Sequence, residues 1–92
     1  MNGSETLRIL LVEDNPPDAE FVKDLLQESE ATYFAVDVAE TIAEALQRVS
    51  EQRYDIILLD LALPDSSGPE TFETLSTRTL EVPIVILTGL ED

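Results

Sequence analysis

Four short apolar runs, separated by stretches with helical spacing, constrain the fold of this chain more than any other sequence feature. The runs are Leu7–Val12, Tyr33–Val38, Asp55–Leu59 and Val82–Leu87. Each has the length of a strand buried in a sheet and is shorter than an ordinary buried helix. Apolar strands that alternate with helices form parallel sheets with helices on both faces. The sequence therefore predicts an α/β fold with a doubly wound parallel sheet.

The interval between the first two runs carries the signals of a helix. The pair Pro16-Pro17 suits a first helical turn, and Asp18 suits the positive end of the helix dipole. We expect this helix to extend to about Ser29. Its apolar face, interpreted as core, consists of Phe21, Val22, Leu25 and Leu26.

Two further helices are predicted in the remaining intervals. Thr41 and Glu44 form the Thr-x-x-Glu pattern of a capping box, and apolar residues follow at helical spacing. Pro69 suits the first position of a third, shorter helix that ends before Pro83. Phe72 on this helix is also interpreted as core.

The composition excludes several function classes. Twenty Asp and Glu residues against five Lys and Arg residues give a net charge of -15, and the chain has no His and no Cys. Disulfides, structural zinc, thiol nucleophiles and histidine bases are therefore excluded. The negative charge disfavours binding to nucleic acids and to anionic membranes.

The length of 92 residues allows one small domain. The first six residues lack the basic and apolar regions of a signal peptide, and the longest uninterrupted apolar runs, of four residues, are too short to cross a bilayer. We expect a soluble, cytoplasmic protein.

Acidic residues follow the apolar runs at the positions where a doubly wound sheet binds its ligands. Glu13 and Asp14 follow the first run, and Asp60 follows the third. Taken singly, each acid is an ordinary loop residue. Together at one sheet edge, like charges require protonation or a cation. Carboxylates without His or Cys are typical ligands of Mg²⁺, which the sequence predicts here.

The spacing of these residues resembles that of the receiver domain of two-component response regulators. The resemblance rests on the first run with Glu13-Asp14, the third run with Asp60, and the fourth run with Thr88, and it covers nearly the whole chain. It implies a flavodoxin-like fold with the strand order 2-1-3-4-5 described for a chemotaxis receiver. It also implies signalling by phosphoryl transfer instead of turnover of a substrate as an enzyme.

Site roles follow from the resemblance. Asp60 would be the phosphoacceptor, with a histidine kinase or a phosphotransfer protein as donor. Glu13, Asp14 and Asp60 would hold Mg²⁺, together with the backbone carbonyl of Ala62.

Four further residues receive roles in the same way. Thr88 would contact the phosphoryl group and report phosphorylation, and Gly89 would leave room for the backbone to approach that group. Pro64 and Gly68 would shape the loop after the phosphoacceptor.

The sequence departs from the family pattern at its end. A receiver continues with a helix, a strand that carries a lysine and a switch aromatic, and a last helix. Neither residue has a counterpart here, because Lys23, the only lysine, lies in the first predicted helix. We therefore expect residues 1–92 to form a single, partial receiver domain that lacks the last helix-strand-helix.

Two alternatives to a phosphorylated receiver stay open. The first is an interaction module that keeps the fold without being phosphorylated, or a dimerising fragment. The run Val82–Leu87 would lie at a sheet edge and pair with another copy, so a homo-oligomer is expected. The second is a phosphatase or nucleotide-binding enzyme, which the sequence disfavours because no glycine-rich loop follows the first run.

Overall fold

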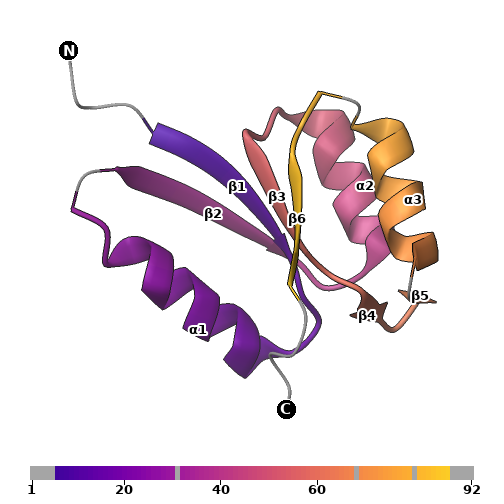
Figure 1. The fold of residues 1–92 in the computed structure, drawn as a ribbon, viewed down its shortest axis with the longest axis horizontal. Helices are drawn as coiled ribbons and strands as arrows, with labels where there is room; N and C mark the ends of the chain where they lie inside the picture. Colours follow the sequence, from indigo (N-terminus) through magenta and orange to yellow (C-terminus); the bar gives the residue numbers. More distant parts are fainter. Residues whose placement is uncertain (1–5, 31, 68, 80, 88–92) are drawn as a thin grey trace.

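The computed structural model describes residues 6–30, 32–67, 69–79 and 81–87 (Figure 1). Strands and helices alternate along most of this length. The elements are β1 (Thr6–Val12), α1 (Pro16–Gln27), β2 (Tyr33–Ala39), α2 (Ile42–Glu51), β3 (Ile56–Asp60), β4 (Ala62–Leu63), β5 (Ser66–Ser67), α3 (Pro69–Arg78) and β6 (Ile84–Leu87).

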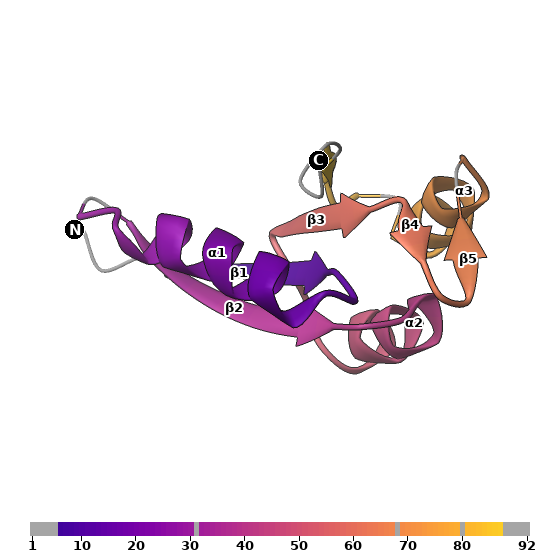
Figure 2. The same cartoon turned by 90° about the horizontal axis from the view of Figure 1, so that it is seen from below.

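Four parallel strands form the main sheet in the order β2-β1-β3-β6. Helix α1 covers one face of this sheet, and α2 and α3 lie together on the opposite face (Figures 1 and 2). The predicted doubly wound α/β fold is therefore confirmed. The strand with the first acids, β1, pairs with β3, which ends at Asp60, so the two acid-bearing strands are neighbours.

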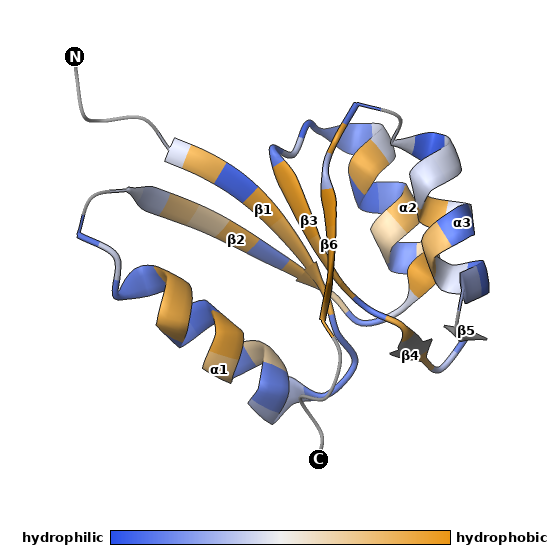
Figure 3. Ribbon diagram, viewed as in Figure 1, coloured by the Kyte–Doolittle hydropathy of each residue, from blue (hydrophilic) through white to orange (hydrophobic). Residues whose placement is uncertain are grey.

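The core consists of two apolar layers, one on each face of the sheet. Alternate residues of a strand point to opposite faces. Accordingly, Leu10 and Ile57 pack in the layer under α2 and α3, whereas Leu11 and Leu58 pack in the layer under α1. Figure 3 shows that apolar residues dominate the strands β1, β3 and β6, whereas apolar and polar residues alternate along the helices.

Side chains cap the first two helices at their N-termini. Asn15 Oδ1 accepts a hydrogen bond from the backbone N–H of Asp18 at 3.1 Å. Thr41 Oγ1 accepts one from the N–H of Glu44 at 3.0 Å, as predicted. The reciprocal bond is shifted by one residue, because Glu44 Oε1 accepts from Glu40 N–H. None of the three described helices has the length and apolar character required to span a membrane.

Several predictions from the sequence were wrong in detail. Phe21 and Leu25 of α1 are 55% and 52% exposed, and Phe72 of α3 is 37% exposed, although all three were interpreted as core. Helix α1 packs on the sheet through a narrower stripe that includes Ala19 and Val22. The two-residue strands β4 and β5 form an antiparallel hairpin that the sequence did not indicate.

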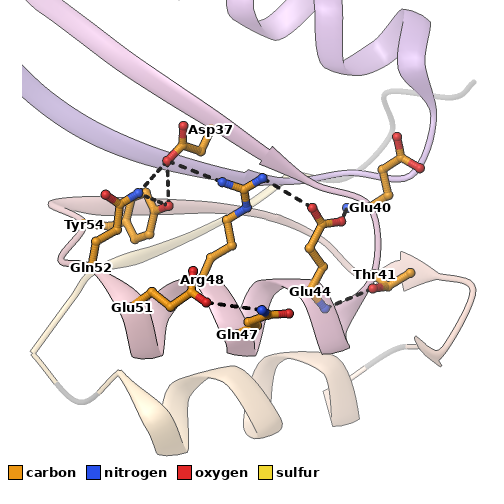
Figure 4. Close-up of polar contacts among 9 residues, drawn as sticks. All are labelled: Asp37, Glu40, Thr41, Glu44, Gln47, Arg48, Glu51, Gln52 and Tyr54. Atoms are coloured by element: carbon orange, nitrogen blue, oxygen red, sulfur yellow. Dashed lines mark hydrogen bonds and ion pairs between the residues drawn. The ribbon is translucent and has the colours of Figure 1, made fainter.

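A polar cluster joins α2 and the following loop to the sheet (Figure 4). Asp37 of β2 accepts hydrogen bonds at 2.7 Å from Tyr54 Oη and from Gln52 Nε2, and Arg48 lies 3.9 Å from the same carboxylate oxygen. The Arg8 guanidinium also donates to the Gln52 side-chain oxygen. Burial and the neighbouring Asp37 raise the pKa of Tyr54, so its hydroxyl keeps its proton and remains a donor.

Candidate functional site

The carboxyl ends of β1 and β3 bring three acidic side chains together. Glu13 and Asp14 directly follow β1, and Asp60 is the last residue of β3. One carboxylate oxygen from each lies within 4.8 Å of the others. The sequence predicted this convergence from the rule that a doubly wound sheet binds its ligands at the carboxyl ends of its strands, and the structure brings the three residues together there.

Glu13 is fixed in this cluster by its backbone and by burial. Its N–H donates to the carbonyl of Ala39 at 2.9 Å, which extends the β1–β2 ladder by one residue. Its side chain accepts a hydrogen bond from the N–H of Asn15 at 3.2 Å, and only 1% of the residue is exposed. A buried carboxylate with so few donors is costly to keep charged.

The electrostatics of Glu13 reflect this environment. Burial is the main cause that raises its pKa from 4.5 to about 7, and the charge of Asp60 and a side-chain hydrogen bond with Asp60 raise it further. The hydrogen bond from Asn15 N–H lowers the pKa of Glu13 and so partly offsets these effects. The site therefore holds more negative charge than its own donors balance at neutral pH.

A cation would relieve this imbalance. Glu13 Oε1 and Asp14 Oδ1 are buried and accept no hydrogen bond from any residue in the described part of the chain. Three convergent carboxylates suit a hard divalent ion such as Mg²⁺, which prefers a few oxygen ligands and retains water. Glu13, Asp14 and Asp60 could hold such an ion, and the donor set fits it.

The loop after Asp60 is held by two helices. Thr71 of α3 is fully buried, and its hydroxyl donates to the carbonyl of Leu61 at 3.2 Å. At the tip of the β4–β5 hairpin, the Asp65 carboxylate accepts hydrogen bonds from the first two N–H groups of α2, those of Ile42 and Ala43. Neither residue was identified from the sequence. Only the turn-forming pair Pro64-Asp65 could have drawn attention to the hairpin.

The other predicted site residues are placed as follows. Ala62 lies in β4, paired with Ser67, so its backbone follows the acid cluster closely. Pro64 is exposed in the turn of the hairpin, which suits a role in loop geometry. Gly68, Thr88 and Gly89 lie outside the described residues.

The fold and this site can be compared with known proteins. The profile of the response regulator receiver domain family matches residues 9–92. The chain belongs to this family. Receiver domains are components of two-component signalling systems. The four parallel strands and three helices of this chain have the flavodoxin-like fold of receiver domains.

Individual receiver proteins show the same relationship. The chain is 37% identical to the cell cycle response regulator CtrA of Brucella ovis over 84 residues, which are 91% of this chain and 35% of CtrA. It is 32% identical to the non-phosphorylated HemR receiver domain from Leptospira biflexa, covering 87% of this chain and 62% of that one, with a TM-score of 0.71.

A third receiver was solved with a metal ion. The receiver domain of the sensor histidine kinase PA1611 from Pseudomonas aeruginosa has a magnesium ion coordinated in its active site cleft. It is 30% identical to this chain. The match covers 91% of this chain and 68% of the PA1611 receiver, with a TM-score of 0.78. The chain thus spans about a third of the length of the curated relatives and about two thirds of the length of the solved receivers.

Proposed function

We propose that Asp60 accepts a phosphoryl group and that Glu13, Asp14 and Asp60 hold the Mg²⁺ ion needed for this transfer. The observation that carries the proposal is the convergence of the three carboxylates at the carboxyl edge of the sheet. The buried atoms Glu13 Oε1 and Asp14 Oδ1, which accept no hydrogen bond from the described residues, support a cation site. The magnesium ion in the related PA1611 receiver supports its identity.

In this proposal Asp60 is the nucleophile. One carboxylate oxygen attacks the phosphorus atom of a phosphohistidine, the bond from phosphorus to the imidazole nitrogen breaks, and an acyl phosphate forms on Asp60. Mg²⁺, when bound, would supply positive charge to neutralise the phosphoryl oxygens. Glu13 and Asp14 would supply the charge that retains the cation, and the Ala62 carbonyl would add a neutral oxygen ligand.

Thr88 and Gly89 complete the proposed site. The Thr88 hydroxyl would bind a phosphoryl oxygen and so convert phosphorylation into a conformational signal. Gly89 would let the backbone approach the phosphoryl group, because it has no Cβ atom. The domain would thus relay a signal and would not turn over a substrate as an enzyme.

In this proposal the donor is a histidine kinase or a histidine phosphotransfer protein, and the domain acts in the cytoplasm. The net charge of -15 argues against nucleic acid or anionic membrane as a partner of this segment.

Labelling by acetyl phosphate tests the phosphoacceptor. We expect the wild-type chain to gain the mass of one phosphoryl group in the presence of Mg²⁺ and not after chelation. Asp60→Asn should abolish the gain. Asp24→Asn, which removes an exposed aspartate of α1, is the matched control and should label normally. Unchanged labelling of Asp60→Asn, or no labelling of the wild type, would overturn the proposal.

A second function, self-association, is favoured by the edge of the sheet. In the described part of the chain, β6 pairs with β3 on one side, and its residues Val85 and Ile86 are 48% and 41% exposed. We propose that β6 pairs with β6 of a second copy, since an apolar edge strand is a template for such pairing. This module could act without phosphorylation, and the labelling experiment separates the two functions.

A further inference from the structure

The loop that follows Asp60 is attached to the fold at three successive points. The Leu61 carbonyl accepts a hydrogen bond from Thr71 of α3. Leu63, 6% exposed, packs in the core layer beneath α2 and α3. Beyond the turn, Asp65 Oδ1 and Oδ2 accept hydrogen bonds from Ile42 N–H at 2.9 Å and Ala43 N–H at 3.1 Å.

The third attachment differs from the other two in what it connects. Asp65 and Ile42 are 23 residues apart in the chain, and the bond joins the tip of the hairpin to the first turn of α2. Each oxygen of the carboxylate engages a separate N–H group that has no partner within the helix. The positive end of the helix dipole adds to the attraction. These bonds lower the pKa of Asp65 and keep it charged.

The connection between Asp65 and the acid cluster is short and stiff. Pro64 fixes its own backbone φ angle near −65° and precedes Asp65 directly. Ala62 and Leu63 are paired with the other hairpin strand. The path from Asp60 to Asp65 therefore has few free torsions, and movement at the turn is transmitted to the backbone beside the cluster.

We propose that Asp65 is a positioning residue: by capping α2 from the hairpin, it holds the backbone of residues 61–63 in place beside Glu13, Asp14 and Asp60. The proposal rests on the proposed function, because the backbone that it positions includes the Ala62 carbonyl. It also makes the first turn of α2 and the phosphoacceptor loop a single mechanical unit. Loss of the Asp65 carboxylate should loosen both together.

Thr41 provides a matched control because it caps the same helix through a hydrogen bond from Glu44, a residue of α2 itself and not of the loop. Its hydroxyl accepts from Glu44 N–H at 3.0 Å, so Thr41→Val and Asp65→Ala each remove N-terminal capping from α2. Only Asp65→Ala also releases the hairpin. Asp65→Asn keeps one good acceptor oxygen and loses the charge, and its effects should fall between those of wild type and Asp65→Ala.

Hydrogen exchange of the metal-free protein tests the positioning directly. We expect Asp65→Ala to speed exchange of the backbone amides both in the first turn of α2 and at residues 61–63. Thr41→Val should speed exchange in the first turn of α2 alone. If the amides of residues 61–63 exchange at the same rate in the two variants, the proposal is overturned.

Metal binding and labelling test the functional consequence. We expect Asp65→Ala to bind Mg²⁺ roughly tenfold more weakly and to label with acetyl phosphate more slowly, whereas Thr41→Val matches the wild type. If the wild type labels and Asp65→Ala equals Thr41→Val in both assays, the inference is wrong and the proposed function stands. If the wild type does not label, the proposed function fails, and hydrogen exchange still decides whether Asp65 holds the loop.

Discussion

Glu13 and Asp60 extend from neighbouring parallel strands and bring carboxylate oxygens within 4.8 Å of each other. Two carboxylates at this separation repel when both are charged. The sheet enforces the contact because Val12 pairs with Leu59 immediately before the two acids. The strand pairing thus maintains an electrostatic repulsion between Glu13 and Asp60 that a cation can relieve.

Asp14 should dominate the affinity for Mg²⁺. One of its oxygens is buried and accepts no hydrogen bond from the described residues, so its desolvation is compensated only by a cation. We expect Asp14→Asn to weaken Mg²⁺ binding roughly tenfold or more, measured by isothermal titration calorimetry. Asp24→Asn, an exposed aspartate of α1, should leave the affinity unchanged. Equal affinities for both variants would exclude Asp14 as a ligand.

Glu13 should give the metal-free protein a stability that declines as the pH rises. Folding raises the pKa of Glu13 from 4.5 to about 7, so between these values the folded chain holds a proton that the unfolded chain has released. Its contribution to stability is present below pH 4.5 and is lost as the pH rises through 7. Protonation of the same group should weaken Mg²⁺ binding as the pH falls below 7.

The variant Glu13→Gln tests this expectation by urea unfolding below pH 4.5 and above pH 7. The neutral amide cannot titrate, so the decline should disappear and the variant should be more stable than wild type above pH 7, by on the order of 2 kcal/mol. Glu28→Gln, at an exposed position after α1, is the control and should keep the wild-type decline. An unchanged decline in Glu13→Gln would assign the effect to another group.

The polar cluster beneath α2 should contribute measurably to stability. Tyr54 is 6% exposed, and its hydroxyl donates to Asp37 and accepts from Gln52. Tyr54→Phe removes both bonds and should lower the free energy of unfolding by about 1–2 kcal/mol, measured by urea denaturation. The other tyrosine, Tyr33, is 76% exposed, so Tyr33→Phe should change stability by less than about 0.5 kcal/mol. Similar effects of the two substitutions would mean that the cluster is energetically neutral.

The edge of β6 should mediate self-association. Val85→Lys places a charge on this strand and should shift the chain toward monomer in light scattering at high concentration. Leu25→Lys offers a close match, because Leu25 of α1 is 52% exposed and Val85 is 48% exposed. We expect Leu25→Lys to leave the assembly intact. A wild-type chain that stays monomeric at high concentration would contradict pairing through β6.

The parts of the fold that the sequence predicted share a strong local signal. The apolar run before Glu13 contains no competing pattern, and Thr41 lies three residues before Glu44, so a strand and a capped helix were identified at their observed places. The convergence of Glu13, Asp14 and Asp60 followed from parallel pairing, since a ladder fixes which strand ends lie together. The chemistry of the acids then indicated a cation.

What the sequence could not show depends on contacts distant in the chain. Asp37 interrupts an apolar run, and its place there becomes intelligible only beside Tyr54 and Arg48, which lie later in the chain. Aspartate is common in turns, so Asp65 alone gives no sign of a special role. Its hydrogen-bond partner, Ile42, lies 23 residues earlier in the chain. Strands of two residues, such as β4 and β5, are too short to produce a periodic pattern.

The position of β1 in the middle of the sheet also sets an order of events during synthesis. β1 is made first, yet its inner neighbour β3 is made only after α1, β2 and α2. Until β3 leaves the ribosome, one edge of β1 has no strand to pair with, and Glu13 and Asp14 have no third carboxylate beside them. A nascent chain that ends within α2 should therefore carry two of the three clustered acids, Glu13 and Asp14, and no complete cation site.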